Sequence, residues 1–199
     1  MAFALLVTLG IPSQAQARVT KTWTADFDQD GVEEKLLKVT GVRRIRRYRE
    51  PTEQLIISDP GFRNGARIPV SPRVVHLAAA GSRLQTPGDA VPDIYWRGYS
   101  GGMSLRLAYF GVANWTGTGV RYLWRYTWKD FGDSSRYAGA EFEVKDNLPD
   151  WPGREIILYE KFIRRGEPLC CPSGERQSVF AYDPTSGTFI GVGEGEEQF

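Results

Sequence analysis

The residues best suited to chemistry form an acidic run near the start of the chain, Asp26-Phe27-Asp28-Gln29-Asp30-Gly31-Val32-Glu33-Glu34. Carboxylates at alternate positions can surround a hard cation if the chain turns sharply between them, and Gly31 allows such a turn. The spacing therefore predicts one metal site. Its ligands would be the side chains of Asp26, Asp28, Asp30 and Glu34 and the main-chain carbonyl of Val32.

This acidic run does not have the pattern of an EF-hand. An EF-hand loop carries a glutamate at its twelfth position and lies between two helices. Here the twelfth residue is Leu37, and the residues on both sides of the run alternate as strands do. We therefore expect a metal loop that connects two strands.

The evidence for a catalytic site is weaker. Gly98-Tyr99-Ser100-Gly101-Gly102 fits the G-x-S-x-G template of a nucleophilic serine. However, the one histidine, His76, precedes this serine by only 24 positions, too few to build the two barrels of a chymotrypsin-like triad. The sequence also lacks a phosphate loop and a dinucleotide fingerprint. We therefore assign no catalytic residue.

Aromatic and basic runs allow a structural or a binding interpretation. Period-two alternation predicts that Tyr122, Trp124, Tyr126 and Trp128 share one face, which is more often a packed core than a platform for sugars. The arginines between positions 43 and 49 are expected to line a solvated strand edge. A net charge of +1 gives no electrostatic support for nucleic-acid binding.

The chain as a whole has the pattern of an all-β protein. Apolar and polar residues alternate over short runs that are separated by Gly, Pro, Asn and Asp. The aromatic content of 13% also favours pleated, half-buried surfaces. Strands are predicted at 20–25, 35–40, 54–58, 74–78, 94–97, 104–109, 122–128, 141–144, 156–159, 178–182 and 188–191.

An internal repeat organises these strands. Three segments share an acidic turn, a following acidic residue and an apolar strand, and they begin at Asp30, Asp89 and Asp150. These aspartates are 59 and 61 positions apart. We therefore predict a single all-β domain at 18–199, built from three blade-like antiparallel repeats at approximately 18–76, 77–137 and 138–199.

With its loop, period and flanking strands, the chain resembles the FG-GAP or VCBS-type repeats of integrin-like β-propellers. The resemblance implies one calcium site, at Asp26, Asp28, Asp30 and Glu34, with Glu34 in place of the family's last Asp. The second repeat has Gln85 and Pro87 at the first two ligand positions, and the third keeps Asp146 but has Leu148. These two repeats are expected to bind no metal.

Three repeats are too few to close a propeller readily, since closed propellers have about four or more blades. The sequence therefore leaves two arrangements open: a homo-oligomer, or sheets that pack differently.

The first 17 residues carry no charge and end in Ala15-Gln16-Ala17, the small-x-small pattern of a signal-peptide cleavage site. We therefore predict a signal peptide at 1–17 and a secreted or periplasmic location, with no membrane span elsewhere. In an oxidising compartment, the adjacent Cys170 and Cys171 could form a vicinal disulfide. Buried thiols and an intermolecular bridge are the alternatives.

Two functions remain compatible with these observations. The favoured one is an exported, non-catalytic, calcium-stabilised β-repeat module that binds a protein or glycan at the cell envelope. The alternative is a secreted or periplasmic hydrolase that acts on polysaccharide through carboxylates assembled from loops.

Overall fold

The computed structural model describes residues 17–45, 48–61, 66–68, 76–85, 92–100, 107–133, 135–148, 151–168 and 171–198. Within these ranges the chain forms three antiparallel sheets of four strands, and each sheet uses four consecutive strands in chain order. Each sheet is therefore an up-and-down meander, the arrangement of a propeller blade. The sheets begin at Arg18, His76 and Tyr137, about 60 residues apart.

The predicted all-β class with three blade-like repeats is confirmed, and the sheets do not close into a barrel or propeller within the described residues. A short 3-10 helix, η1 (Trp128–Phe131), follows the second sheet.

The first sheet contains β1 (Arg18–Ala25), β2 (Glu34–Ile45), β3 (Tyr48–Ser58) and β4 (Ala66–Ile68). The second contains β5 (His76–Gln85), β6 (Pro92–Ser100), β7 (Leu107–Trp115) and β8 (Val120–Thr127). The third contains β9 (Tyr137–Leu148), β10 (Trp151–Phe162), β11 (Gly174–Asp183) and β12 (Thr188–Gln198).

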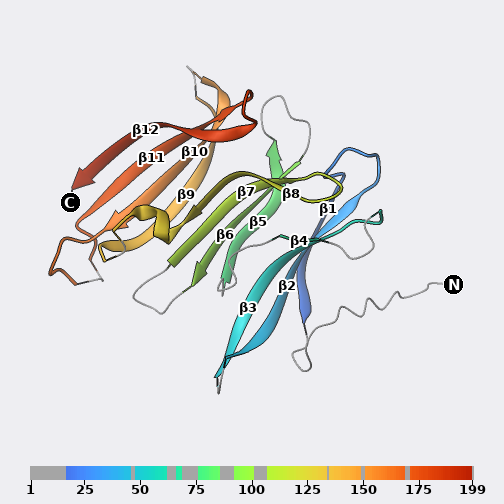
Figure 1. Cartoon of the computed structure of the whole chain (residues 1–199), viewed down its shortest axis with the longest axis horizontal. Coiled ribbons are helices and arrows are strands. Elements are labelled where there is room, and N and C mark those ends of the chain that lie inside the picture. Colours follow the sequence, from blue (N-terminus) through green and yellow to red (C-terminus); the bar gives the residue numbers. More distant parts are fainter. Residues whose placement is uncertain are drawn as a thin grey trace.

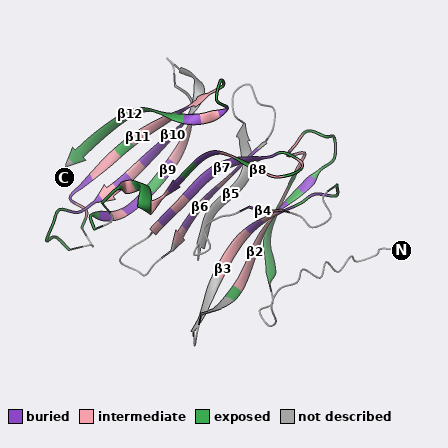
Figure 2. Cartoon of the chain, in the orientation of Figure 1, coloured by how far each residue is buried: buried purple, intermediate pink, exposed green. Residues whose placement is uncertain are grey.

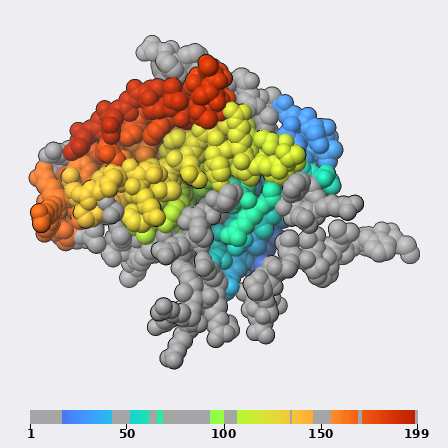
Figure 3. Space-filling view, in the orientation of Figure 1, coloured from blue at the N-terminus to red at the C-terminus, as the bar shows by residue number. Residues whose placement is uncertain are grey.

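The second sheet lies between the other two, with the first and third sheets at opposite ends of the stack (Figure 1). One face of the second sheet packs Trp96 and Trp115 against the first sheet, in a core that includes Leu55. The other face packs Phe110 and aromatic residues of β8 against the third sheet. Buried residues are accordingly concentrated in the strands of the second sheet and in those that face it (Figure 2). The space-filling view shows the three sheets as successive bands from blue to red (Figure 3).

The stack has a direction that repeats from sheet to sheet. Leu36 of β2 faces forward, into the core shared with the second sheet. In β6, Trp96 faces back to the first sheet, whereas Tyr95 packs forward against the core shared with the third. Leu158 of β10 faces back to the second sheet. Each sheet therefore packs its forward face on the back face of the next.

The aromatic run in β8 is split between both cores, so the predicted single aromatic face is wrong. Val112 pairs with Trp124 and Ala113 with Tyr122, which leaves Leu123 as the extra residue of a β-bulge. The bulge turns Tyr122 toward the first sheet, where its ring meets Trp96 edge-on at 5.9 Å between ring centroids. Trp124, only 6% exposed, instead faces the third sheet. The expected core role of these rings is confirmed.

Each of the eleven predicted strands overlaps a strand of the structure. Among the described strands, sequence analysis missed β4, whose three residues are too few to show alternation. Trp128 was expected to end a strand and instead opens η1. Parts of the predicted strands at 74–78 and 104–109 lie outside the described residues, as do residues 1–16 of the expected signal peptide.

Candidate metal centre

The loop between β1 and β2 brings four carboxylates together. One oxygen atom from each carboxylate lies within 4.8 Å of the others. Glu34 opens β2, and the other three residues precede it in the loop. The cluster thus contains four of the five predicted ligands, Asp26, Asp28, Asp30 and Glu34.

The loop folds tightly around its own carboxylates. Gln29 and Gly31 both have left-handed backbones, with φ of 62° and 88°, and glycine adopts this conformation without steric cost. The amide of Gly31 donates to Asp26 Oδ2 at 3.0 Å, and the amide of Val32 donates to Asp30 Oδ1 at 2.8 Å. The backbone therefore binds one oxygen of these carboxylates and fixes their orientation.

Glu34 is the most deeply buried member of the cluster, at 1% exposure. Its Oε2 accepts a hydrogen bond of 2.6 Å from the amide of Phe27. Among the described residues, its Oε1 has no hydrogen-bond partner, and neither does the buried Oδ1 of Asp26. A buried carboxylate oxygen without a partner is costly, so each of these atoms requires a proton or a cation.

The electrostatics of the cluster lead to the same conclusion. Burial raises the pKa of the Glu34 carboxyl, and the charges of Asp28, Asp59 and Asp26 raise it further. Burial also raises the pKa of Asp28, which the neighbouring carboxylates increase again. Without a cation the site resists carrying its full negative charge, and a bound cation would relieve this repulsion.

The cluster lies against the second sheet. Gly117, in the turn between β7 and β8, has a φ of 73°, and a Cβ atom there would lie 2.6 Å from Asp28 Oδ2. Only glycine fits this close approach. The turn is closed by the amide of Thr116, which donates to the carbonyl of Gly119 at 3.0 Å. The metal loop of the first sheet therefore contacts a hairpin of the second.

Asp59, at the end of β3, strengthens this junction. It is 8% exposed, and its Oδ2 accepts a hydrogen bond of 3.1 Å from Nε1 of Trp115 in β7. Its Oδ1 accepts a hydrogen bond of 2.6 Å from the amide of Gly61. Both oxygens thus have partners, and Asp59 contributes negative charge close to the cluster.

Sequence reasoning missed Asp59 and Gly117 because the fold brings both near the loop from distant parts of the chain, and no local pattern identifies them. The predicted fifth ligand, Val32, lies in the same loop, where its amide donates to Asp30. The role of its carbonyl stays a prediction. Oxygen is the sole donor type in the set of four, and hard cations such as Ca²⁺ and Mg²⁺ prefer such donors.

The corresponding loops of the other repeats fall largely outside the described part of the chain. The backbone of Gln85 is described, whereas Pro87, Asp89 and Asp150 lie outside it, as do the side chains of Asp146 and Leu148. The acidic residues that follow those loops, Asp93 and Glu155, are buried like Glu34. A buried acidic residue within the first five positions of the second strand is therefore common to all three sheets.

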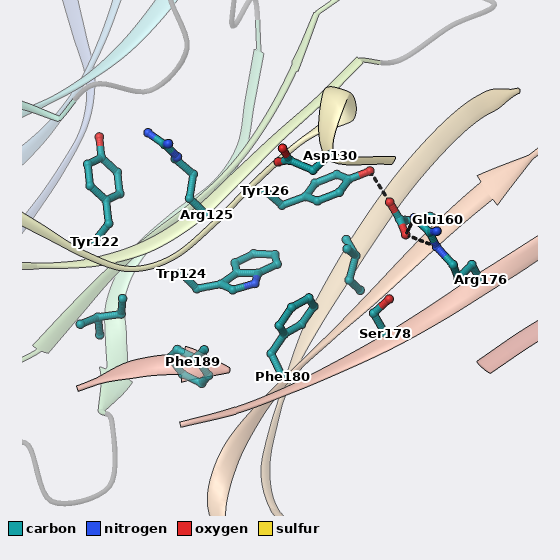
Figure 4. Close-up of a pocket in the computed structure, with 12 residues that line it drawn as sticks. Tyr122, Trp124, Arg125, Tyr126, Asp130, Glu160, Arg176, Ser178, Phe180 and Phe189 are labelled. Carbon is teal, nitrogen blue, oxygen red and sulfur yellow. Dashed lines mark hydrogen bonds and ion pairs between the residues drawn. The ribbon is translucent and has the colours of Figure 1, made fainter. Parts of the chain in front are cut away.

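A second feature is an open cleft of about 640 Å³ between β8 and the third sheet (Figure 4). Trp124, Phe180 and Phe189 form its apolar wall, and the polar end holds Glu160 and Arg176. Glu160 is 1% exposed and accepts a hydrogen bond of 2.7 Å from the Tyr126 hydroxyl. Nε and Nη2 of Arg176 bind its other oxygen at 2.6 and 2.5 Å. This buried carboxylate is fully paired.

The structure describes little of the other residues that the sequence analysis singled out. His76 and Ser100 belong to neighbouring strands, but their side chains lie outside the described residues, as do those of the arginines at 43–49. Cys170 lies outside them too, and the vicinal disulfide stays a prediction. Cys171 is exposed, and its amide donates to the carbonyl of Pro168 at 3.3 Å.

No helical segment within the described residues has the length and apolar character needed to cross a bilayer. No family model, curated protein or solved structure matches the chain.

Proposed function

We propose that the chain is an exported, calcium-stabilised β-repeat module that binds a protein or glycan at the cell envelope and catalyses no reaction. One observation carries the metal part of this proposal. In a cluster of four carboxylates, the buried oxygens Glu34 Oε1 and Asp26 Oδ1 have no hydrogen-bond partner among the described residues. A cation at this position would satisfy both atoms and neutralise the cluster.

Calcium suits this site better than magnesium. Calcium accepts six to eight oxygen ligands in irregular geometry, including main-chain carbonyls, whereas magnesium needs near-ideal octahedral geometry and retains several waters. Four carboxylates within one tight loop, with the Val32 carbonyl as a candidate fifth ligand, fit calcium. The strand-loop-strand context within a four-stranded meander also agrees with the FG-GAP or VCBS resemblance, which we retain as part of this proposal.

The ion would act as a structural link. Asp28 lies against the turn that contains Gly117, and the Trp115–Asp59 hydrogen bond joins the same two sheets. Calcium bound in the loop would therefore stabilise the junction of the first and second sheets. Because the unfolded chain lacks the assembled site, calcium would raise the free energy of unfolding by mass action.

Thermal unfolding of the chain in calcium and in chelator tests the metal part of the proposal. We expect calcium to raise the Tm of the wild type and to leave the Tm of an Asp28→Ala, Asp30→Ala double variant unchanged. Asp133→Ala is the matched control, since Asp133 lies in an exposed acidic turn far along the chain, and it should keep the full response. Equal Tm values for the wild type in both buffers would refute the calcium site.

The alternative of a polysaccharide hydrolase gains no support from the cleft. Both oxygens of Glu160 are bound by Tyr126 and Arg176, and Asp130 accepts hydrogen bonds from the amide and hydroxyl of Thr127. Both oxygens of Glu160 are therefore engaged within the protein, and one oxygen of Asp130 caps η1. A pull-down on insoluble polysaccharides, combined with an assay for released reducing ends, separates the two functions. We expect no release, with retention on the solid if the ligand is a glycan, whereas release that tracks the purified chain would favour the hydrolase.

A further inference from the structure

The stack of sheets ends in two faces that no other sheet covers within the described residues. In the first sheet, Leu36 and Ile57 point into the core shared with the second sheet, so the alternate residues point away from it. They form the back face of the first sheet, which includes Val19, Lys35, Leu37, Val39, Ile56 and Arg67.

The third sheet ends the stack in the opposite direction. Ile156 and Leu158 point into the core shared with the second sheet, so the alternate residues of β10 and its partners point outward. They form the front face of the third sheet, which includes Glu141, Ile157, Tyr159, Glu175, Val179 and Glu197.

The chain already forms one kind of interface twice, where the front face of one sheet packs on the back face of the next. The two end faces are a front face and a back face of the same kind. Aligning the buried acidic residues Glu34, Asp93 and Glu155 places Leu36, Tyr95 and Ile157 at the same repeat position. Leu36 and Tyr95 both pack forward on the next sheet. Ile157 points in the same direction, and no fourth sheet lies in front of it within the described chain. Ile157 itself is only 4% exposed, so the exposed residues around it, Glu141 and Glu197, would make the contact.

The two end faces also have complementary charge. Among described side chains, the back face of the first sheet carries Lys35 and Arg67 and no carboxylate. The front face of the third sheet is acidic, since its glutamates outnumber its two lysines. Each face also has a large apolar residue about half exposed at its edge, Val19 at 50% and Ile190 at 47%. Charge complementarity of this kind steers the association of folded chains and selects their partners.

We propose that a second copy of this chain packs the front face of its third sheet on the back face of the first sheet, and that two copies close a ring of six sheets. The contact is head-to-tail, because it joins two different surfaces. Two copies suffice because propellers contain about four to eight blades, whereas three copies would give a ring of nine sheets. This inference does not depend on the calcium site.

Two charge-reversal variants of the full chain test the proposal by light scattering coupled to gel filtration. The back-face variant is Lys35→Glu, Arg67→Glu, and the front-face variant is Glu141→Lys, Glu197→Lys. We expect the wild type to have the mass of two chains and each variant alone to bind itself roughly 100-fold more weakly, because like charges then meet. An equimolar mixture of the variants should regain the two-chain mass, since both of its interfaces are again complementary.

Recovery of the two-chain mass in the mixture is expected only for a head-to-tail contact. Mixing would not restore association if the variants were misfolded or if the contact joined two identical faces. Lys129→Glu, Arg165→Glu is the control, because both residues are exposed and lie on neither end face; it should behave as the wild type. A wild type that stays a single chain at every concentration would overturn the proposal. Variants that keep the two-chain mass alone, a mixture that does not associate, or polymers that grow with concentration would also overturn it.

Discussion

Two buried glutamates, one at each junction between sheets, have opposite surroundings. Glu34 and Glu160 are each 1% exposed. Glu160, between the second and third sheets, has a hydrogen bond to each oxygen and a guanidinium partner (Figure 4). Glu34, between the first and second sheets, has one amide partner, and its second oxygen has none among the residues that the structure describes; its neighbours are other carboxylates. The protein supplies its own cation to one glutamate, and we infer that the other needs an external one.

The largest expected effect follows from removing Arg176, the cation that the protein itself supplies to Glu160. Arg176→Met would leave Glu160 buried without its counter-ion, which costs about 3–5 kcal/mol in the free energy of unfolding. Urea denaturation should show the same loss in calcium and in chelator, because the acidic cluster found among the described residues lies at the other junction. Arg125→Met, which removes an exposed arginine from the same cleft, is the control and should cost under about 1 kcal/mol. A similar small loss for Arg176→Met would mean that the buried pair contributes little.

The next largest effect is the gain in stability on calcium binding beside Glu34. At a calcium concentration 100 times the Kd, binding should stabilise the wild type by about 2.7 kcal/mol, which is about 5–10 °C in Tm for a chain of this size. Glu34→Gln removes the unpaired charge while keeping the shape of the side chain. It should abolish the calcium response and leave stability in chelator unchanged or higher.

Glu160→Gln is the matched variant at the other junction. It should lower stability in both buffers, because a charge-assisted hydrogen bond is lost, and it should retain the calcium response. If Glu34→Gln and Glu160→Gln behave alike in the two buffers, the contrast between the junctions is wrong.

A smaller effect concerns the turn that contacts the loop. Gly117→Ala places a methyl group 2.6 Å from Asp28 Oδ2 at a φ of 73°, so we expect a loss of about 1–2 kcal/mol and weaker calcium binding. Gly119→Ala, in the same hairpin, meets no atom within 4 Å and should change stability by less than about 0.5 kcal/mol. Equal losses in calorimetry would show that the contact with Asp28 is unimportant.

The smallest effect is on pH dependence. Burial raises the pKa values of Glu34 and Asp28 above their usual 4.5 and 3.8, so the folded chain binds protons there more tightly than the unfolded chain. In chelator, these groups should add stability as the pH falls from neutral toward those usual values, and this contribution is lost as the pH rises. In calcium the sign should reverse, because protons compete with the ion. Tm measured across this range in both buffers would reveal the difference, and parallel curves would contradict it.

The fold could be predicted from sequence to the extent that its signals are local. Alternation and turn residues identified every described strand that is long enough to show a pattern, and the spacing of Asp30, Asp89 and Asp150 identified three repeats. The bulge at Leu123 could not be predicted, because it is defined by the register between two strands rather than by the sequence of one. It determines which core receives Tyr122.

The same distinction applies to the candidate site. The spacing within the loop identified the four carboxylates, whose oxygens the fold brings together. The close approach of Gly117 and the pairing of Asp59 with Trp115 depend on how two sheets pack. The Glu160–Arg176 pair likewise joins adjacent strands, β10 and β11, whose register the sequence alone does not reveal.

Equilibrium dialysis of the chain against radioactive calcium tests the central claim most directly. We predict one ion bound per wild-type chain, weaker competition by magnesium than by unlabelled calcium, and no bound ion in Glu34→Gln. A folded wild type that binds no calcium, or a Glu34→Gln variant that binds as the wild type does, would contradict the claim that Glu34 is buried in order to hold a cation.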